Sequence, residues 1–279
     1  MLIQTKHAPI AFGLRPLVMG ILNVTPDSFS DGGRFTRAEA LSSQVRSMLE
    51  NGVDLIDVGG ESTRPYAEAV SEHEELRRVL PAIACIRELH RSIPISIDTT
   101  KAEVARQALT TGADIINDVS GLRFDPEMVR VAIDLEAPVI LMHMRKSPKD
   151  MQDEPVYDDV VGEIMDFLAE RISWATQQGL DREQIIVDPG LGFGKTVEHN
   201  LTILKHLQAF KKLACPLLVG HSRKSFIGRL LGLETRDRDL ATALISSYCA
   251  AQGADILRVH DVGKTVQAVR LHEAIRQAT

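Results

Sequence analysis

Eight short apolar runs of the sequence lead into polar side chains that could bind a ligand. Three of these side chains supply oxygen acceptors, which would suit a flat heterocycle whose edge is rich in N–H groups. Four others are cationic donors of the kind that bind a phosphate or diphosphate. One asparagine could ligate Mg²⁺, which needs few protein ligands when phosphates and waters complete its octahedron. The acceptors are Asp98, Asn117 and Asp188, the cationic donors are Arg64, Lys224, Arg258 and His260, and the asparagine is Asn23.

The glycine-rich segment "IIVDPGLGFGKT", residues 185–196, invites comparison with a phosphate-binding loop. That loop has the pattern G-x-x-x-x-G-K-[ST], and its first glycine would fall where this chain has Pro189. The spacing therefore excludes the motif. The segment instead predicts a strand that ends at Asp188, followed by a glycine loop that lets a ligand approach the backbone closely. Lys195 is left without a predicted role, and Lys224 is predicted to be the functional lysine.

Three histidines also follow apolar runs, so a zinc hydrolase is a competing hypothesis. They are His143, His221 and His260. Such sites commonly need closely spaced ligands, and the chain offers neither H-x-H after its first run nor H-E-x-x-H in a helical segment. Zinc hydrolysis is therefore disfavoured. His221 fits a packing or solvent-facing position equally well.

The elements that would position these residues alternate regularly along the chain. Eight short runs rich in β-branched residues alternate with eight helical segments, and no linker or low-complexity tract separates them. This predicts the α/β class and a (β/α)₈ barrel, formed as a single domain of residues 1–279, rather than an open sheet. The expected strands are 17–24, 53–60, 93–98, 113–118, 138–144, 184–188, 215–220 and 254–260.

In such a barrel the loops that follow the strands form one face, so the polar residues at the strand ends should meet there. Ser96 and Asp98 would share one face of their strand, but the sequence leaves open whether that face points into the barrel or toward the helices. Residues 1–16 are expected to be a leader segment that contains a possible short hairpin. Helices are predicted to begin at the capping residues Thr36, Ser71 and Thr100.

Composition excludes several classes of function. The net charge of −6 and an aromatic content of 4% argue against a nucleic-acid-binding protein. No apolar run reaches the roughly 18 residues of a membrane span, so no membrane association is expected. The three cysteines lie far apart and form no C-x-x-C, which fits core packing in a reducing, cytoplasmic compartment.

Eight ordered motifs resemble those of the bacterial dihydropteroate synthases. They are "GILNVTPDSFSDGG", "IDVGGESTRP", "SIDTTK", "IINDVSG", "LMHM", "DPGLGFGK", "SRKSFIG" and "RVHDV", and the similarity spans residues 17–275. The resemblance implies condensation of 6-hydroxymethyl-7,8-dihydropterin diphosphate with 4-aminobenzoate, which yields 7,8-dihydropteroate and diphosphate. It also implies Mg²⁺ as cofactor and a homodimer formed through the later helices.

The resemblance further implies roles for individual residues. The pterin would be held by Asp98, Asn117, Met142, Asp188, Phe193 and Lys224, and the catalytic residues would be Asp98, Lys224 and Asn23. The diphosphate would contact Asn23, Arg64, Arg258 and His260, with the metal on Asn23. The aminobenzoate, and sulfonamides in its place, would lie against Phe29, Thr63, Arg64, Pro65 and Ser225.

A second hypothesis is a related pterin-binding barrel that passes a methyl group from methyltetrahydrofolate to a corrinoid protein. The segments "TPDSFSDGG" and "SRKS" argue against it, as does the lack of a corrinoid-binding module in the sequence. A third hypothesis, a protein that binds pterin without catalysis, is disfavoured by the full set of polar residues at the strand ends.

Overall fold

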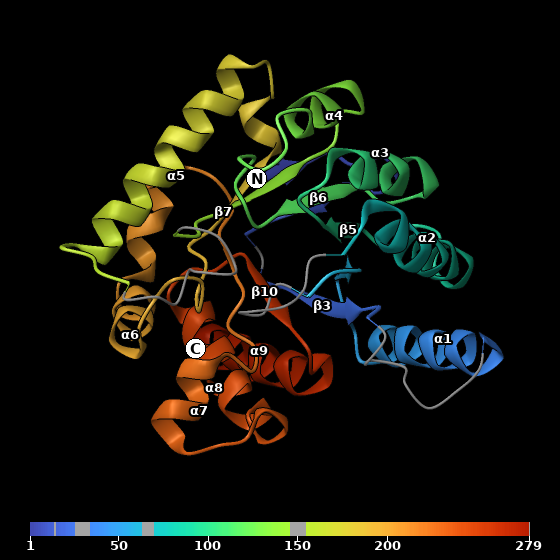
Figure 1. The fold of residues 1–279 in the computed structure, drawn as a ribbon. Helices are drawn as coiled ribbons and strands as arrows, with labels where there is room; N and C mark the ends of the chain where they lie inside the picture. Colours follow the sequence, from blue (N-terminus) through green and yellow to red (C-terminus); the bar gives the residue numbers. More distant parts are fainter. Residues whose placement is uncertain (14, 26–33, 63–69, 146–154, 279) are drawn as a thin grey trace.

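The computed structural model describes residues 1–13, 15–25, 34–62, 70–145 and 155–278, with the backbone alone at 34–37. Its centre is one sheet of eight parallel strands, and in this sheet each strand pairs with its neighbour in the chain from β3 to β8 (Figure 1). The strands are β3 (Leu17–Asn23), β4 (Leu55–Gly59), β5 (Ile95–Asp98), β6 (Ile115–Asp118), β7 (Val139–Met142), β8 (Ile185–Asp188), β9 (Leu218–Val219) and β10 (Ile256–Val259).

The sheet closes on itself. β10 pairs with both β9 and β3, and the remaining gap between β8 and β9 is bridged by Val187 and Leu217. The Val187 amide also donates to the Pro216 carbonyl at 2.9 Å. The predicted (β/α)₈ barrel is therefore confirmed.

Helices surround the barrel, as Figure 1 shows. None of those in the described part of the chain is both long enough and apolar enough to cross a membrane. The helices are α1 (Arg34–Glu50), α2 (Glu72–Leu89), α3 (Ala102–Thr111), α4 (Met128–Asp134), α5 (Val160–Gln177), α6 (Val197–Lys205), α7 (Ser225–Leu231), α8 (Asp239–Ala251) and α9 (Val262–Gln277), with short 3₁₀ turns η2 (Arg182–Gln184), η3 (Leu207–Leu213) and η4 (Thr235–Asp237).

Side chains along each strand alternate between two hydrophobic layers, because successive residues of a strand point to opposite faces. Ile95 and Ile97 belong to the large layer between the sheet and the helices. Their neighbours Ser96 and Asp98 therefore point into the barrel, which answers the question that the sequence left open. The same alternation turns Asp57, Asn117 and Asp188 inward, above an inner apolar layer formed by Met19, Leu55, Ile115, Ile140, Ile186, Leu218 and Ile256.

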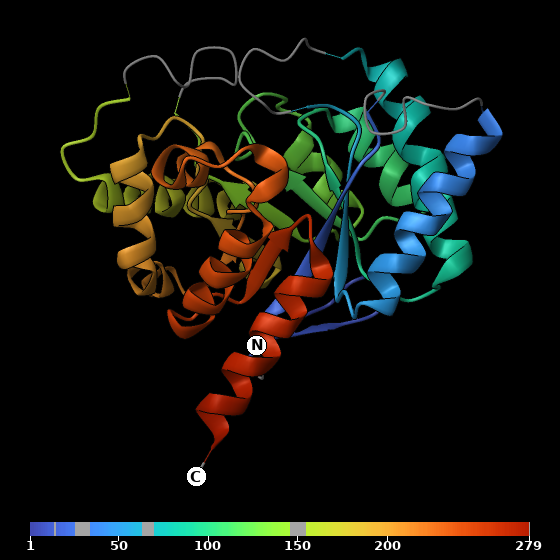
Figure 2. The same ribbon diagram turned by 90° about the horizontal axis from the view of Figure 1, so that it is seen from below.

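A hairpin at the N-terminus closes the end of the barrel at which the strands begin. β1 (Leu2–Ile3) and β2 (Ile10–Ala11) pair antiparallel, and Figure 2 shows them below the strands. Ile3, Ile10 and Phe12 pack into the inner apolar layer. The predicted hairpin is confirmed, and its apolar side chains form part of the core.

The starts of the helices show which of them can be predicted from the neighbouring residues alone. Ser71 caps α2 as predicted, since its hydroxyl accepts from the Glu74 amide at 3.3 Å. Thr100 does not cap α3, which begins at Ala102. The Ala102 amide instead donates to the Asp125 carboxylate at 2.8 Å, a cap supplied from a distant loop. α1 begins at Arg34, before the predicted Thr36.

Candidate functional site

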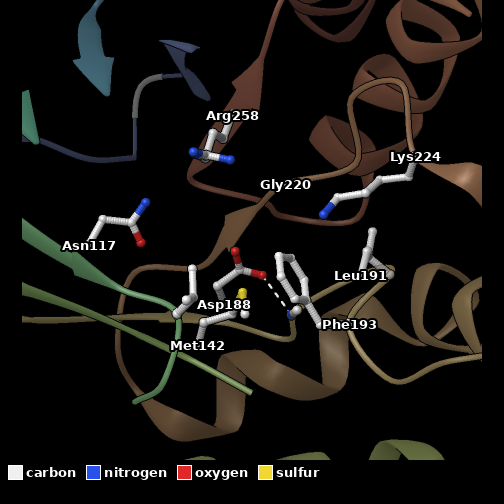
Figure 3. A pocket seen from close by; sticks show the side chains of 10 residues that line it. Asn117, Met142, Asp188, Leu191, Phe193, Gly220, Lys224 and Arg258 are labelled. Carbon is white, nitrogen blue, oxygen red and sulfur yellow. Dashed lines mark hydrogen bonds between the residues drawn. The ribbon is translucent and has the colours of Figure 1, made fainter. Parts of the chain in front are cut away.

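A small cavity lies at the end of the barrel where the strands terminate (Figure 3). Side chains from β6, β7, β8 and β10 meet there with residues of the loops that follow β8 and β9. Five of the six residues predicted to hold a pterin line this cavity, and Asp98 is the exception. The lining residues are Asn117, Val119, Met142, Asp188, Gly190, Leu191, Phe193, Gly220, Lys224 and Arg258.

Asp188 presents one carboxylate oxygen to the cavity. Its Oδ1 accepts from the Gly190 amide at 2.7 Å, the contact that is dashed in Figure 3. Its Oδ2 faces Gly220, where an added Cβ would lie 3.6 Å away. Burial raises the pKa of Asp188, and the Gly190 amide opposes this effect. A ligand N–H that donated to Oδ2 would likewise favour the carboxylate.

Lys224 and Phe193 form the opposite wall. The Lys224 Nζ lies 4.0 Å from the centre of the Phe193 ring, a cation–π contact. Burial lowers the pKa of Lys224 to about 8, and the charge of Arg258 acts in the same direction. The backbone beside them is close-packed, because a Cβ on Gly192 would lie 2.9 Å from the lysine Cδ.

Arg258 lines the cavity but is already paired with two carboxylates. Its Nε donates to Asp57 at 2.6 Å, and an Nη nitrogen donates to Asp98 at 2.6 Å. Burial raises the pKa of Asp98 to about 7, although the charge of Arg258 opposes the shift. Asp98 thus lies behind the guanidinium and outside the set of described residues that line the cavity.

Asn23 is the one predicted metal ligand, and it is the last residue of β3, at the end of the barrel where the cavity lies. Its Oδ1 lies 3.6 Å from the position that a Cβ on Gly59 would occupy, next to Asp98. Within the described residues no three His, Cys, Asp or Glu side chains are grouped so as to hold a metal ion. An ion at Asn23 would therefore need phosphate oxygens and waters for most of its coordination, which Mg²⁺ accepts readily.

The other predicted site residues fall into two groups. His260 lies beside Ser222, whose Oγ is 2.9 Å from its Nδ1, and Ser225 is the exposed first residue of α7. Burial lowers the pKa of His260 to about 3, which favours the neutral ring in the ligand-free protein, and a bound anion would oppose this shift. Phe29, Thr63, Arg64 and Pro65 lie outside the described residues.

The histidines do not support the zinc hypothesis, since each has its own partner in a different part of the described structure. His143 Nδ1 lies 2.9 Å from the Lys195 Nζ. The fully buried His221 ring contacts the Ser246 hydroxyl of α8 at 2.8 Å, so it is a packing residue and not a solvent-facing one.

Lys195 has no role predicted from the sequence, yet it is buried at the base of the glycine loop. Its ammonium group reaches the Gly190 carbonyl at 2.8 Å, the Phe193 carbonyl at 2.9 Å and the His143 ring. Burial lowers the pKa of Lys195, but three acceptors around one nitrogen match the three protons of the charged form. Lys195 therefore fixes the loop that carries Phe193 over the cavity.

Gly190 is expected to be indispensable to the same loop. It has φ +69°, and a Cβ would lie 1.9 Å from the His143 carbonyl oxygen. Gly190→Ala should lower the free energy of unfolding in urea by about 2–4 kcal/mol. Gly232→Ala is the matched control: φ is +68° but no described atom lies within 4 Å, so only the conformational cost of about 1–2 kcal/mol should appear. Equal losses in the two variants would contradict the close contact.

Comparison with known proteins identifies the family of this chain. Residues 19–260 match the pterin binding enzyme family. A dihydropteroate synthase of Synechocystis is 49% identical over 265 residues, which cover 95% of this chain and 91% of the relative. That of Escherichia coli is 46% identical, and the alignment covers 94% and 93% of the two chains.

Comparison with solved structures leads to the same family. A Yersinia pestis dihydropteroate synthase in a sulfonamide drug complex has a TM-score of 0.93 at 42% identity over the whole of both chains. A Xanthomonas albilineans dihydropteroate synthase in complex with 7,8-dihydropteroate has a TM-score of 0.90 at 42% identity, again over the whole of both chains. On these sequence and structural grounds, the chain belongs to the pterin-binding enzyme family and, within it, to the dihydropteroate synthases.

Proposed function

We propose that this protein condenses 6-hydroxymethyl-7,8-dihydropterin diphosphate with 4-aminobenzoate, releasing 7,8-dihydropteroate and diphosphate. The observation that carries this proposal is the mixed character of one cavity. Asn117 and Asp188 offer acceptors to a flat ring, while Lys224 and Arg258 bring positive charge to the same space. A heterocycle rich in N–H groups that carries an anionic leaving group matches both halves.

The chemistry that these residues support is electrostatic. As the bond between the exocyclic carbon and the diphosphate oxygen breaks, the oxygen keeps the electron pair and positive charge develops on the carbon. Asp188 and the more distant Asp98 stabilise that charge, while Lys224 and Arg258 stabilise the departing anion. The aromatic amine then forms the new C–N bond and releases a proton, so no side-chain nucleophile is required.

We further propose that Asn23 holds Mg²⁺ together with the diphosphate. A bound Mg²⁺ would neutralise charge on the leaving group. The support is the amide oxygen of Asn23 near Asp98, at the end of the barrel where the strands terminate, and the small number of protein ligands that Mg²⁺ requires. His260 and Arg64 complete the proposed anion contacts, with His260 acting as a hydrogen-bond donor.

For the aminobenzoate we propose the region around Ser225, which directly follows Lys224 at the start of α7. Phe29, Thr63, Arg64 and Pro65 are proposed to complete that region. A Xanthomonas albilineans dihydropteroate synthase whose structure was solved with 4-aminobenzoic acid is 46% identical to this chain and has a TM-score of 0.89. The Yersinia pestis sulfonamide drug complex supports the proposal that this protein also binds sulfonamides.

Turnover tests the proposal directly. With Mg²⁺ present, diphosphate should be released only when the pterin substrate and 4-aminobenzoate are both supplied, and 7,8-dihydropteroate should appear in equal amount. Absence of product under these conditions would refute the function. A parallel incubation with methyltetrahydrofolate and a cobalamin protein addresses the methyltransferase alternative, for which we expect no transfer.

We propose that the protein is a homodimer formed through α7, α8 and α9. Isolated apolar side chains are common on protein surfaces, but a group of them on adjacent helices marks an interface. α8 and α9 pack against each other. Their exposed apolar residues, with those of α7, are Leu230, Leu231, Leu240, Leu244, Tyr248, Leu271 and Ile275.

A charge on this face should separate the subunits. Leu240 and Leu244 lie one turn apart on α8 and are 68% and 65% exposed, so glutamates there should not disturb the monomer. We expect Leu240→Glu with Leu244→Glu to halve the mass measured by light scattering after gel filtration. Leu135→Glu, at an exposed leucine beyond α4, should leave the mass unchanged. A wild-type protein that is monomeric at micromolar concentration would refute the dimer.

We also propose the reducing cytoplasm as its compartment, because Cys85, Cys215 and Cys249 are all free thiols and the latter two are buried.

A further inference from the structure

Asp57 belongs to none of the binding groups described above, yet it lies at the centre of the polar layer beneath the cavity. It comes from β4, its side chain points into the barrel, and it is fully buried. It is not one of the described residues that line the cavity. A buried carboxylate is costly unless donors surround it, so its partners indicate what it does.

Among the described residues, three side chains donate to Asp57. The Arg258 Nε donates to Oδ2 at 2.6 Å, and the Ser96 hydroxyl donates to Oδ1. The Asn117 amide nitrogen lies 3.2 Å from Oδ1 and 3.3 Å from Oδ2. Two of these donors, Asn117 and Arg258, themselves line the cavity. Asp57 thus contacts the binding surface from behind.

The contact with Asn117 determines which half of its amide faces a ligand. A carboxylate only accepts hydrogen bonds, so the NH₂ group of Asn117 must face Asp57. Its carbonyl oxygen is then turned toward the cavity, as Figure 3 shows for the labelled Asn117. Without Asp57 the amide could present either its donor or its acceptor to a bound ring, because the two halves have nearly the same shape.

We propose that Asp57 is a positioning residue for pterin recognition: it holds the Asn117 amide in the one orientation that offers an acceptor to an N–H group of the ring. This inference rests on the proposed function, because it concerns how the same cavity selects its heterocycle. Asp188 also presents an acceptor to the cavity, because the Gly190 amide fixes which of its oxygens faces the cavity. The two acceptors together favour a donor-rich ring edge.

Asp57→Asn should reverse this arrangement. The new amide would keep its oxygen on the charged Arg258 donor and turn its NH₂ toward Asn117, because a charged donor forms the stronger hydrogen bond. Asn117 would then rotate to accept, and its own NH₂ would face the N–H group of the ligand. Affinity for 6-hydroxymethylpterin, measured by titration calorimetry, should fall by about tenfold to a hundredfold.

Exchanging the two residues should restore binding. In the double variant Asp57→Asn, Asn117→Asp, the amide introduced on β4 can donate to the carboxylate introduced on β6, whose second oxygen faces the cavity as an acceptor. We expect affinity for the pterin to recover at least tenfold relative to Asp57→Asn alone. The exchange conserves the total charge and the number of amides, so a general loss of packing cannot account for a recovery. It also remains testable if the single variant folds poorly.

Ser96→Ala is the matched control, because it removes one donor from Asp57 without altering what faces Asn117. Its pterin affinity should stay within about threefold of wild type. Thermal unfolding midpoints of all variants would be measured beside the titrations. Wild-type affinity in Asp57→Asn would overturn the inference, as would an exchange variant that folds but binds no better than the single variant. Failure of the wild-type enzyme to bind the pterin would instead refute the proposed function.

Discussion

Replacing Lys224 by methionine is expected to lower kcat/KM for the pterin substrate by about 10²- to 10³-fold, the usual cost of losing one charged group that stabilises a transition state. The side chain lines the cavity, and its ammonium group lies 4.0 Å from the Phe193 ring, so methionine would keep the packing while removing the charge. Steady-state kinetics with each substrate varied in turn would measure the loss. An effect below about fivefold would show that Lys224 is not part of the reaction.

The pH dependence of kcat/KM should show whether the reaction requires the positive charge of Lys224. The pKa of Lys224 is lowered to about 8, so the ammonium form that the reaction needs is present below that pH and is lost as the pH rises through it. The wild-type kcat/KM should therefore decline above about pH 8. In Lys224→Arg the side chain stays charged throughout this range, and the alkaline decline should move to higher pH even if the overall rate is lower. An unchanged decline would assign it to another group.

Asp188→Asn is expected to be nearly as damaging, although the two side chains have the same shape. The Gly190 amide donates to Oδ1 at 2.7 Å, so an asparagine would keep its oxygen there and turn its NH₂ toward the cavity. The ligand would lose an acceptor and meet a donor, a penalty of about 3–4 kcal/mol that corresponds to a loss of 10²- to 10³-fold in kcat/KM.

Asp118→Asn is the control for this variant, because Asp118 also ends a strand and is also buried. Its two oxygens accept from the Ser120 and Leu122 amides at 2.8 and 3.0 Å, away from the cavity. Loss of one of these bonds should lower the free energy of unfolding by about 1–3 kcal/mol while kcat/KM changes less than threefold. Similar kinetic losses in both variants would contradict the orientation argument for Asp188.

Much of this site could be predicted from the sequence, because a barrel converts order along the chain into proximity in space. Parallel strands end at one mouth, so polar residues that follow apolar runs must meet there. Asn117, Asp188 and Lys224 can be found in this way. The prediction needs only the strand pattern and the direction of the strands, and both can be read from local residues.

The pairing among those residues could not be predicted in the same way. Arg258 was predicted from the sequence to bind an anion. In the structure its guanidinium lies between Asp57 and Asp98, which belong to two other strands. The buried position of Lys195 depends on carbonyls in a loop whose shape the sequence does not show. The predicted cap at Thr100 was wrong for a related reason. The backbone amide of Ala102, the first residue of α3, donates to Asp125 in a separate loop. Hydrogen-bond partners depend on distances across the fold, and spacing along the chain carries little information about them.

The hairpin beneath the barrel affects the order in which native contacts form during folding. Ile3 and Ile10 belong to an apolar cluster that also includes Ile256, more than two hundred residues away in the sequence. Contacts of such long range form late in folding, because a large loop of chain must be ordered first. During synthesis the hairpin emerges before any barrel strand, and its complete binding surface exists only after the last strand has been made. The hairpin, made before every barrel strand, is therefore among the last elements to gain its native neighbours.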